Sequence, residues 1–425
     1  MFARFGRFSR PLLLTMVLLP VAASAPAQDL VESLAQQLQQ GQLDAAEASL
    51  RERLTAQPED NQAQFALGVV RVLTAIEHLA QDQYRFGALG GTIQRLPVLR
   101  IPVPQNPQPE AIDYARLRTI FLDFQTRLLQ AEGELAKVDA SSSVALPLDL
   151  ATIRLDLNGD GQAEPRESFL PLLEIVNRQR PGNRAATVVR FDGGDVLWLR
   201  GYCHLLAGFC DLVLAYDHQQ LFDHAGQLIY PKHVQSEEVA EPLDLPGEYP
   251  FELQIVDLIA AIHLMKFSLR EPERMESARR HWLEMVRLSR ESWKLILAED
   301  DNDQEWLPNP KQTGVLGIPV SVEMIDSWQR VLSEMEDLLE GRKLVPFWRD
   351  YRRILAQYPA VPAIGRGFNL KRFFAEPRDF DLVLLIQGTA ALPYIEHGEL
   401  SRPETWQSLT QAFRGQFFGF AIWFN

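Results

Sequence analysis

The sequence predicts a mainly α-helical protein, with a helical N-terminal segment followed by a larger helical domain that contains a few short strands. Three observations lead to this fold class. Apolar residues recur at helical spacing over most of the chain beyond residue 110, and segments with the two-residue alternation of strands are few. Hydrophobic residues make up 46% of the 425, enough for a large core and for two or three domains.

Residues 1–27 have the three-part pattern of a secretory signal peptide. A basic start at residues 4–10 is followed by an apolar run at 12–21 and by the small-residue cleavage box Ala25-Pro26-Ala27. The apolar run falls well short of the roughly 20 residues that a membrane span needs. We therefore expect an exported protein, periplasmic or secreted, whose mature chain begins near Gln28 and has no transmembrane segment.

The charge of the chain narrows the class of partner. The full chain carries a net charge of −14, and loss of the three arginines of the signal segment takes it to −17. A chain this acidic repels phosphate backbones and anionic lipid. We therefore expect protein partners and no nucleic acid.

Residues 28–86 carry a helical-repeat pattern. Gly41, Leu50, Leu54, Pro58 and the pair Leu67-Gly68 are spaced as in the second helix of one tetratricopeptide repeat and the start of the next. The resemblance to this repeat family covers about residues 29–80. It implies stacked helix pairs, and hence a helical-repeat-like segment ahead of the larger domain.

Residues 87–110 are rich in proline and glycine. Prolines at this density disfavour helix and favour an extended path, so we expect a linker or a wrapped arm here. Residues 111–425 would then form the larger, mainly helical domain.

Within this domain the periodicity predicts several helices and three strands. The helices are expected at residues 114–135, 196–215, 253–269, 275–296 and 320–340, and those at 196–215 and 253–269 are apolar on most sides, as core helices are. The strands are expected at residues 146–155, 187–190 and 382–386.

One segment carries a chemical motif. Residues 156–167, with the sequence DLNGDGQAEPRE, resemble the twelve-residue EF-hand calcium loop at each of its key positions. Calcium prefers six to eight oxygen ligands, and this spacing supplies them from one short loop whose Gly161 permits the sharp turn. The expected ligands are the side chains of Asp156, Asn158, Asp160, Glu164 and Glu167, with the last bidentate, and the backbone carbonyl of Gln162.

The segment departs from the EF-hand pattern in four ways, and the lack of a partner loop and of an entering helix favours a structural calcium ion over a sensor. Ala163 replaces the usual apolar residue that pairs two loops, and the sequence contains no second matching loop. Pro165 is atypical, although the first turn of a helix tolerates it. The residues before Asp156 alternate as a strand does, so the loop would lack its entering helix.

A second acidic cluster, at residues 299–305, suggests an alternative. Its sequence, EDDNDQE, lacks the glycine and the twelfth-position acid of a calcium loop. A solvated loop is the first interpretation, and a metal site of an exported metal-dependent hydrolase is the alternative. An acidic cleft at Asp301 and Asp303 beside a histidine would favour the enzyme.

The remaining candidates have simpler explanations. His204, Asp211 and His218 repeat every seven residues, but about 21 Å separates the two histidines on a helix, too far for one metal. Cys203 and Cys210 would be about 10.5 Å apart along a helix, beyond disulfide reach unless the helix breaks at Gly208. Residues 192–195 are expected to form a turn and helix cap. The apolar aromatic run at 417–424 is expected to be a buried terminal segment.

These observations favour an exported calcium-binding protein with a scaffold or interaction role. An outer-membrane-associated assembly factor that uses the aromatic C-terminus is a further alternative. The chain lacks a nucleophile elbow, a zincin pair, a phosphate loop and a dinucleotide fingerprint, which favours a non-enzymatic protein.

Overall fold

The structure is a computed structural model. It describes residues 25–89, 101, 103–169, 187–226, 229–232, 251–317, 319–351, 361–402 and 404. The described part is mainly helical, with a few short strands in small sheets, which confirms the predicted fold class.

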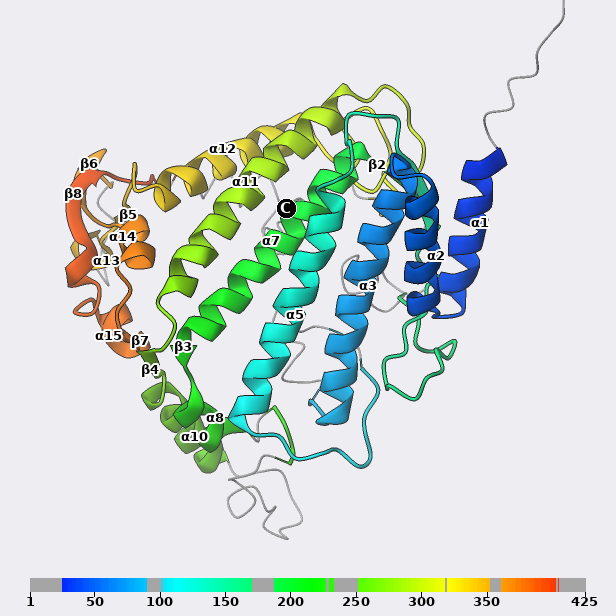
Figure 1. The fold of residues 1–425 in the computed structure, drawn as a ribbon. Coiled ribbons are helices and arrows are strands. Elements are labelled where there is room, and N and C mark those ends of the chain that lie inside the picture. The colour runs from blue at the N-terminus through cyan, green and yellow to red at the C-terminus, as the bar shows by residue number, and fades with distance from the viewer. Residues whose placement is uncertain are drawn as a thin grey trace, which may run out of the picture.

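The body is a row of long helices in which each helix packs against the next one along the row (Figure 1). The row follows the order of the chain. Its members are α1 (Ala25–Gln39), α2 (Leu43–Ala56), α3 (Asn61–Arg85), α5 (Tyr114–Leu135), α7 (Gly193–Ala215), α11 (Glu273–Ala298) and α12 (Val322–Leu339).

Hydrogen bonds and ion pairs between neighbours show that the longer helices alternate in direction. Gln64 near the start of α3 binds Glu134 near the end of α5, whereas Asp82 near the end of α3 binds Arg116 near the start of α5. The later neighbours are also antiparallel. The contacts that show this are Gln125–Ala207 and Arg118–Leu214 between α5 and α7, Ser292–Gly194 and Arg274–Asp211 between α7 and α11, and Trp328–Ser289 and Arg279–Leu339 between α11 and α12.

Polar side chains begin four of these helices. Asp60, Asp113 and Ser321 each accept a hydrogen bond from a backbone N–H of the first turn of α3, α5 and α12. Such caps satisfy N–H groups that have no partner inside the helix. Asp192 and Asp195 form a reciprocal capping box at α7. The turn and helix cap predicted at residues 192–195 are therefore confirmed.

Helices α5 and α11, both predicted from helical spacing, each bury one face in the core. On α5 the buried residues include Ile120, Phe124, Leu128, Ala131 and Leu135. On α11 they include Met275, Ala278, Met285, Ser289, Trp293 and Ile296. Burial of such faces is the main source of helix stability in a protein, because an isolated helix gains little from its own hydrogen bonds.

The strands are short and form small antiparallel sheets. Leu148 pairs with Val189 in the first sheet, so the strands predicted near residues 146 and 187 are confirmed, although the first ends in a turn at Leu150. The sheets are β1 (Ala145–Asp149) with β2 (Val188–Asp192); β3 (Tyr216–Asp217), β4 (Lys266–Leu269) and β7 (Phe380–Asp381); and β5 (Val345–Pro346), β6 (Ile364–Phe368) and β8 (Ile395–Glu399).

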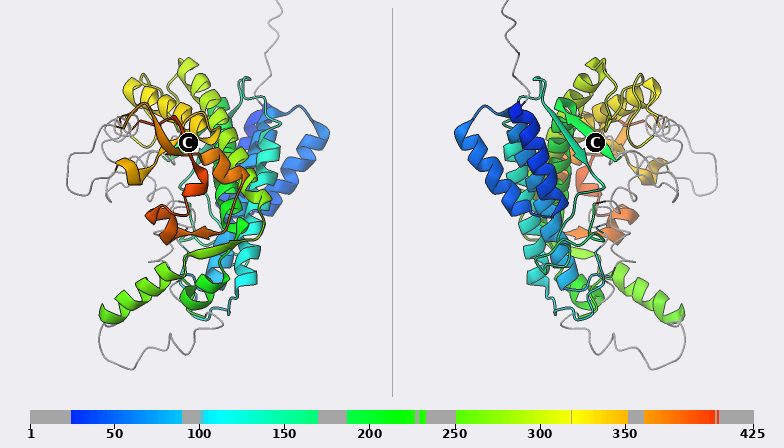
Figure 2. Two further views of the ribbon diagram at one scale, coloured as in Figure 1. Left: turned by 90° about the vertical axis from the view of Figure 1, so that its left-hand side faces the viewer. Right: turned by 90° about the vertical axis from the view of Figure 1, so that its right-hand side faces the viewer.

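The core helix predicted at residues 253–269 is wrong in extent and in burial. Helix α10 (Phe251–His263) is followed by strand β4, and Figure 2 shows the helix projecting from the body. The exposed fractions of Val256, Leu258 and Ile259 are 58–60%. Apolar composition on most sides is typical of a core helix, but it does not determine whether the rest of the chain covers the helix.

The strand predicted at residues 382–386 is also wrong, because these residues form the short helix α15 (Leu382–Gln387). Asp381 caps its start, and Gly388 ends it with a positive φ of 111°. A run of five apolar residues fits a buried strand and a helical turn equally well, so the flanking cap and glycine decide. The other short helices are α8 (Gln219–Ala225), α13 (Trp348–Tyr351), α14 (Leu370–Ala375) and the 3₁₀ turn η2 (Leu392–Tyr394).

Three predictions concern residues that lie wholly or partly outside the described part of the chain. These are most of the signal segment, residues 1–24; residues 90–100 and 102 of the predicted linker; and the aromatic run at 417–424. Among the described helices, α3 and α7 are long and apolar enough to cross a membrane by length and composition. Both are central members of the helix row, and core helices of soluble proteins pass the same test, so this is weak evidence for a span.

Candidate metal centre

The loop predicted to bind calcium is closed at its base by a short antiparallel pairing. The N–H of Leu155 donates to the carbonyl of Glu167, and the N–H of Phe169 donates to the carbonyl of Ile153. Ile153, Leu155 and Leu157 are buried. These apolar anchors and the pairing hold the two ends of residues 156–167 together.

Side chains at the first, third and fifth positions of the loop fold inward onto its backbone. The carboxylate of Asp156 accepts hydrogen bonds from the N–H groups of Gly159 at 2.8 Å and Gly161 at 2.9 Å. Asn158 accepts one from Asp160, and Asp160 accepts one from Gln162, each at 2.8 Å. Gly159 and Gly161 have positive φ angles of 73° and 83°, which L side chains rarely adopt. The tight turn expected at Gly161 is therefore present.

Glu167, the twelfth residue of the loop, is buried. Its side chain is 1% exposed, and its Oε2 accepts a hydrogen bond from the N–H of Glu164 at 3.0 Å. Its Oε1 is buried and has no hydrogen-bond partner. Burial raises the pKa of Glu167, and the charges of Asp156, Asp160 and Glu164 add to this effect. A buried carboxylate oxygen without a partner is costly, and a cation bound by both oxygens would remove that cost.

The other expected ligands do not point to one common position. Glu164 is 44% exposed and forms an ion pair with Arg166 at 2.7 Å. Gln162 is exposed. Within the described residues, the groups of three acids or histidines with ligand atoms within 4.8 Å of one another do not include the loop acids. Asp156 and Asp160 would therefore have to exchange some backbone hydrogen bonds for a cation.

The loop is docked on the N-terminal helices. Asp156 donates its N–H to Glu77 Oε2 at 2.7 Å and accepts at its carbonyl from Gln81 Nε2 at 2.9 Å. Gly41, in the turn between α1 and α2, lies so close to Ala163 that a Cβ at Gly41 would clash with it. In this protein the α1–α2 turn therefore contacts the loop position that usually pairs two EF-hand loops.

Glu77 adds a carboxyl group beside the loop that the sequence analysis missed. Burial raises the pKa of Glu77 to about 7, against the lowering effect of the hydrogen bond from Asp156, and the charges of Asp156, Asp44 and Glu167 contribute to the increase. Nothing in the local sequence marks Glu77 or Gln81, because they lie 75 or more residues before the loop on α3.

The acidic loop at residues 299–305 divides into an exposed tip and a buried base. At the tip, Asp301 and Asp303 are more than half exposed and face Arg190 at 3.8 and 3.4 Å. At the base, Glu299 and Glu305 meet Asp192, and the three carboxylates each place an oxygen within 4.8 Å of the others. The local sequence predicts only a helix cap at Asp192 and gives no sign of this meeting.

The carboxyl groups at and beside the base of this loop have raised pKa values. Burial raises the pKa of Glu299 to about 8, and the charge of Asp192 and a hydrogen bond between the two side chains contribute. Burial, and then the charge of Asp192, raise the pKa of Asp195 well above its ordinary value. Carboxyl groups this close stay ionised together only at a high cost, so at least one of them is protonated at neutral pH.

We expect Glu299→Gln to flatten the dependence of stability on pH. The pKa of this carboxyl is near 4.5 in an unfolded chain and about 8 in the folded one, so unfolding releases its proton between these values. The free energy of unfolding therefore falls as pH rises from 4.5 to 8, and the variant should lose that contribution. Denaturant unfolding at several pH values measures the slope.

The control for this measurement is Glu291→Gln, which alters an exposed acid on the neighbouring helix α11. It should keep the slope of the wild type. A Glu299→Gln slope equal to that of the control would contradict the assignment.

The remaining sequence candidates are separated by the fold. His204 and Asp211 lie on α7, but His218 lies beyond its end, where its Nε2 is 3.1 Å from the carbonyl of Val213. Cys203 and Cys210 are buried free thiols on the unbroken helix α7, as their spacing predicts. Burial raises the pKa of Cys210 to about 12 and that of Cys203 further, so both stay protonated.

Comparisons with protein-family models, curated proteins and solved structures found no match to this chain. A function for it can therefore rest only on its own residues and their geometry. The feature with the most specific chemistry is the 156–167 loop, with its buried and half-satisfied Glu167.

Proposed function

We propose that this chain is an exported calcium-binding protein in which calcium has a structural role and the helical body serves in contacts with other proteins. The observation that carries the proposal is Glu167 Oε1, a buried carboxylate oxygen with no hydrogen-bond partner at the position of the bidentate EF-hand ligand. Calcium would supply the missing partner and neutralise the surrounding acids.

The surroundings of the loop support a structural ion. A sensor EF-hand needs two helices that separate on binding. Here a turn after β1 and a short extended segment, not a helix, lead into the loop. The loop contacts α3 through Glu77 and Gln81 and the α1–α2 turn through Gly41. Calcium would therefore fasten the N-terminal helices to β1 without moving a helix pair.

The interaction role is supported by the shape of the body and by its exposed apolar helix. Helices stacked in chain order present an extended surface, as in helical-repeat proteins. Exposed apolar residues on α10, including Val256 and Ile259, are of the kind found at protein contacts.

The alternative of a metal-dependent hydrolase is supported only by the meeting of Asp192, Glu299 and Glu305. Asp301 and Asp303, the acids expected to line a cleft, are exposed and face Arg190. The scaffold is therefore the better-supported function. The alternative of an outer-membrane-associated factor rests on residues 417–424, outside the described part.

Calorimetric titration of the chain from Gln28 with calcium chloride tests the proposal. We expect one binding event in the wild type and its loss in Glu167→Gln, because the variant keeps the size of the side chain but removes the bidentate charge. Asp301→Asn, an exposed acid outside the loop, is the matched control and should bind as the wild type does. Absence of heat in the wild type would refute the calcium site.

Export is tested separately. N-terminal sequencing of the protein from the periplasmic or culture fraction should find a start at or near Gln28, because cleavage follows the Ala25-Pro26-Ala27 box. An exported chain that still begins at Met1 would contradict the signal-peptide prediction.

A further inference from the structure

Two histidine rings contact each other between the neighbouring helices α7 and α11. His204 Nδ1 and His281 Nδ1 are 2.8 Å apart, which is a hydrogen-bond distance. The ring centroids are 5.0 Å apart. This is close to the nitrogen–nitrogen distance plus the distance from each ring centre to its own Nδ1, so the two nitrogens point at each other nearly along one line.

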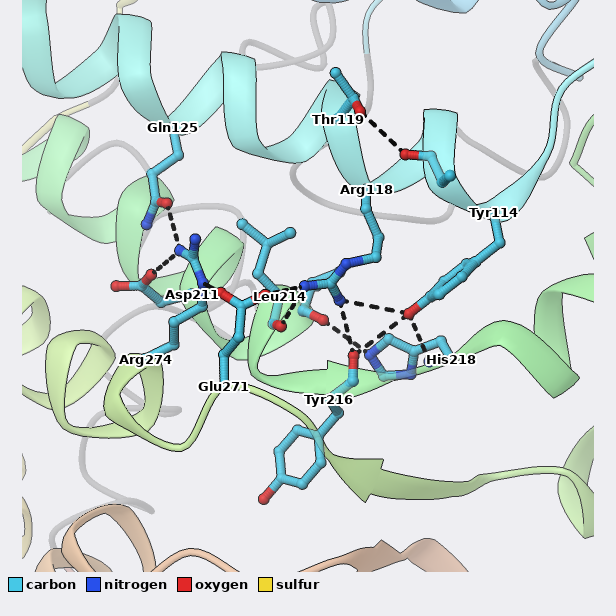
Figure 3. A network of polar contacts seen from close by, with 12 residues as sticks. Tyr114, Arg118, Thr119, Gln125, Asp211, Leu214, Tyr216, His218, Glu271 and Arg274 are labelled. Carbon is cyan, nitrogen blue, oxygen red and sulfur yellow. Dashed lines mark hydrogen bonds and ion pairs between the residues drawn. The ribbon is translucent and has the colours of Figure 1, made fainter.

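A carboxylate stands at the far nitrogen of each ring. His204 Nε2 is 3.6 Å from Glu132, and His281 Nε2 is 3.7 Å from Asp211 Oδ2. Arg200 holds Glu132 from the side at 2.9 Å, and Arg274 holds Asp211 at 2.8 Å. Figure 3 shows Arg274 between Asp211 and Gln125. Asp211 Oδ2 is buried without a hydrogen-bond partner, so it is an available acceptor for an N–H on the His281 side.

Counting protons over the four ring nitrogens gives one favourable state. The Nδ1–Nδ1 contact requires one nitrogen with a proton and one without. The two carboxylates favour a proton on both Nε2 atoms. Three protons satisfy every contact, and three protons make one ring neutral and the other an imidazolium. With two protons, one Nε2 lone pair faces a carboxylate; with four, two Nδ1–H groups oppose each other.

We propose that the His204–His281 pair is an acid-sensitive latch that joins α7 to α11 through one shared proton and opens when a second proton binds. The shared proton lies on the Nδ1–Nδ1 line. Protonation of the second ring removes the only acceptor on that line and places two positive rings in contact. The long helices α7 and α11 are neighbours in the row and pack closely against each other, so the latch acts on the contact between them.

The charges around the pair agree with this assignment. Burial lowers the pKa of His281, and the charge on His204 lowers it further, which favours His281 as the acceptor ring of the pair. Burial opposes ionisation of Glu132, but the hydrogen bond and charge of His204 hold the pKa of Glu132 below its ordinary value. The charged groups around the pair are Glu132 from α5, Arg200 and Asp211 from α7, and Arg274, Arg280 and Glu284 from α11.

The geometry favours a proton over a metal ion. A metal bound by both rings would need the two nitrogens to converge on it at an angle, whereas they point at each other along one line. Within the described residues, the pair also does not join a third acid or histidine in a group within 4.8 Å.

The tautomers can be observed directly in the wild type by nitrogen-15 NMR of labelled histidines near pH 7. We expect one ring of the pair with protons on both nitrogens and the other with a proton on Nε2 alone. His204→Gln and His281→Gln assign the signals. Two neutral rings near pH 7, or a shift of both Nδ1 signals on addition of one equivalent of zinc chloride, would overturn the latch.

Unfolding between pH 7 and pH 5 gives the second readout. The pKa of His281 in the folded chain lies below its ordinary value of 6.5, so between these two values the unfolded chain binds more protons. The free energy of unfolding therefore falls as pH drops from 6.5 through the folded pKa. The equilibrium constant for folding should fall by up to tenfold for each unit by which folding lowers the pKa of His281. His281→Gln should remove this component, and the exposed His397→Gln should retain it. An unchanged slope in His281→Gln would overturn the latch, whereas the NMR result stands even if that variant does not fold.

Discussion

Calcium at a hundredfold excess over its dissociation constant should stabilise the chain from Gln28 by about 2.7 kcal/mol, because a ligand that binds only the folded state shifts the folding equilibrium by mass action. Thermal melting with and without calcium measures the gain. The helix signal in circular dichroism should change little, since the loop already has its tight turn and its base pairing.

Glu167→Gln should change the melting temperature in opposite directions without and with calcium. Without calcium the variant should melt as high as the wild type or higher, because it removes a charge from a buried oxygen that has no partner. With calcium it should melt lower, because it has lost the bidentate ligand. Asp301→Asn should follow the wild type in both conditions.

Two outcomes would contradict this prediction. If calcium leaves the melting temperature of the wild type unchanged, the loop is a polar turn and not a site. If calcium causes a large change in helix signal, the site exists but its role is regulatory.

Trp293→Ala should lower the free energy of unfolding by about 3–5 kcal/mol, the cost typical of a large cavity in a core. Trp293 is 1% exposed in the main core, on the face of α11 that the sequence predicted to be apolar. Trp282 on the same helix is only partly buried, against Phe209 and Phe374, so Trp282→Ala should cost less. Denaturant unfolding of both variants measures the order.

Leu297→Ala is the matched control for the Trp293 variant. Leu297 is on the last turn of α11 and 51% exposed, so its truncation should stay within about 0.5 kcal/mol of the wild type. A Trp293→Ala protein as stable as this control would mean that the face is not part of the core.

The elements that the sequence predicted well depend on neighbours in the chain. The apolar stripes of α5 and α11 follow from the helical period, and the cap at Asp192 follows from residues within one turn. The 156–167 loop is recognisable for the same reason, since all its expected ligands lie within twelve residues. Where two structures share one local pattern, as at residues 382–386, the sequence prediction was wrong.

The sequence by itself determined the helical class, the apolar faces and a loop with oxygen donors at calcium-loop spacing. Only the tertiary structure decided that Glu77 and Gly41 contact that loop, that Asp192 meets Glu299, and that His204 faces His281. It also left α10 exposed. The physical reason is range: periodicity and turn chemistry act over a few residues, whereas these meetings join groups 77 to 122 residues apart, through packing that no local pattern records.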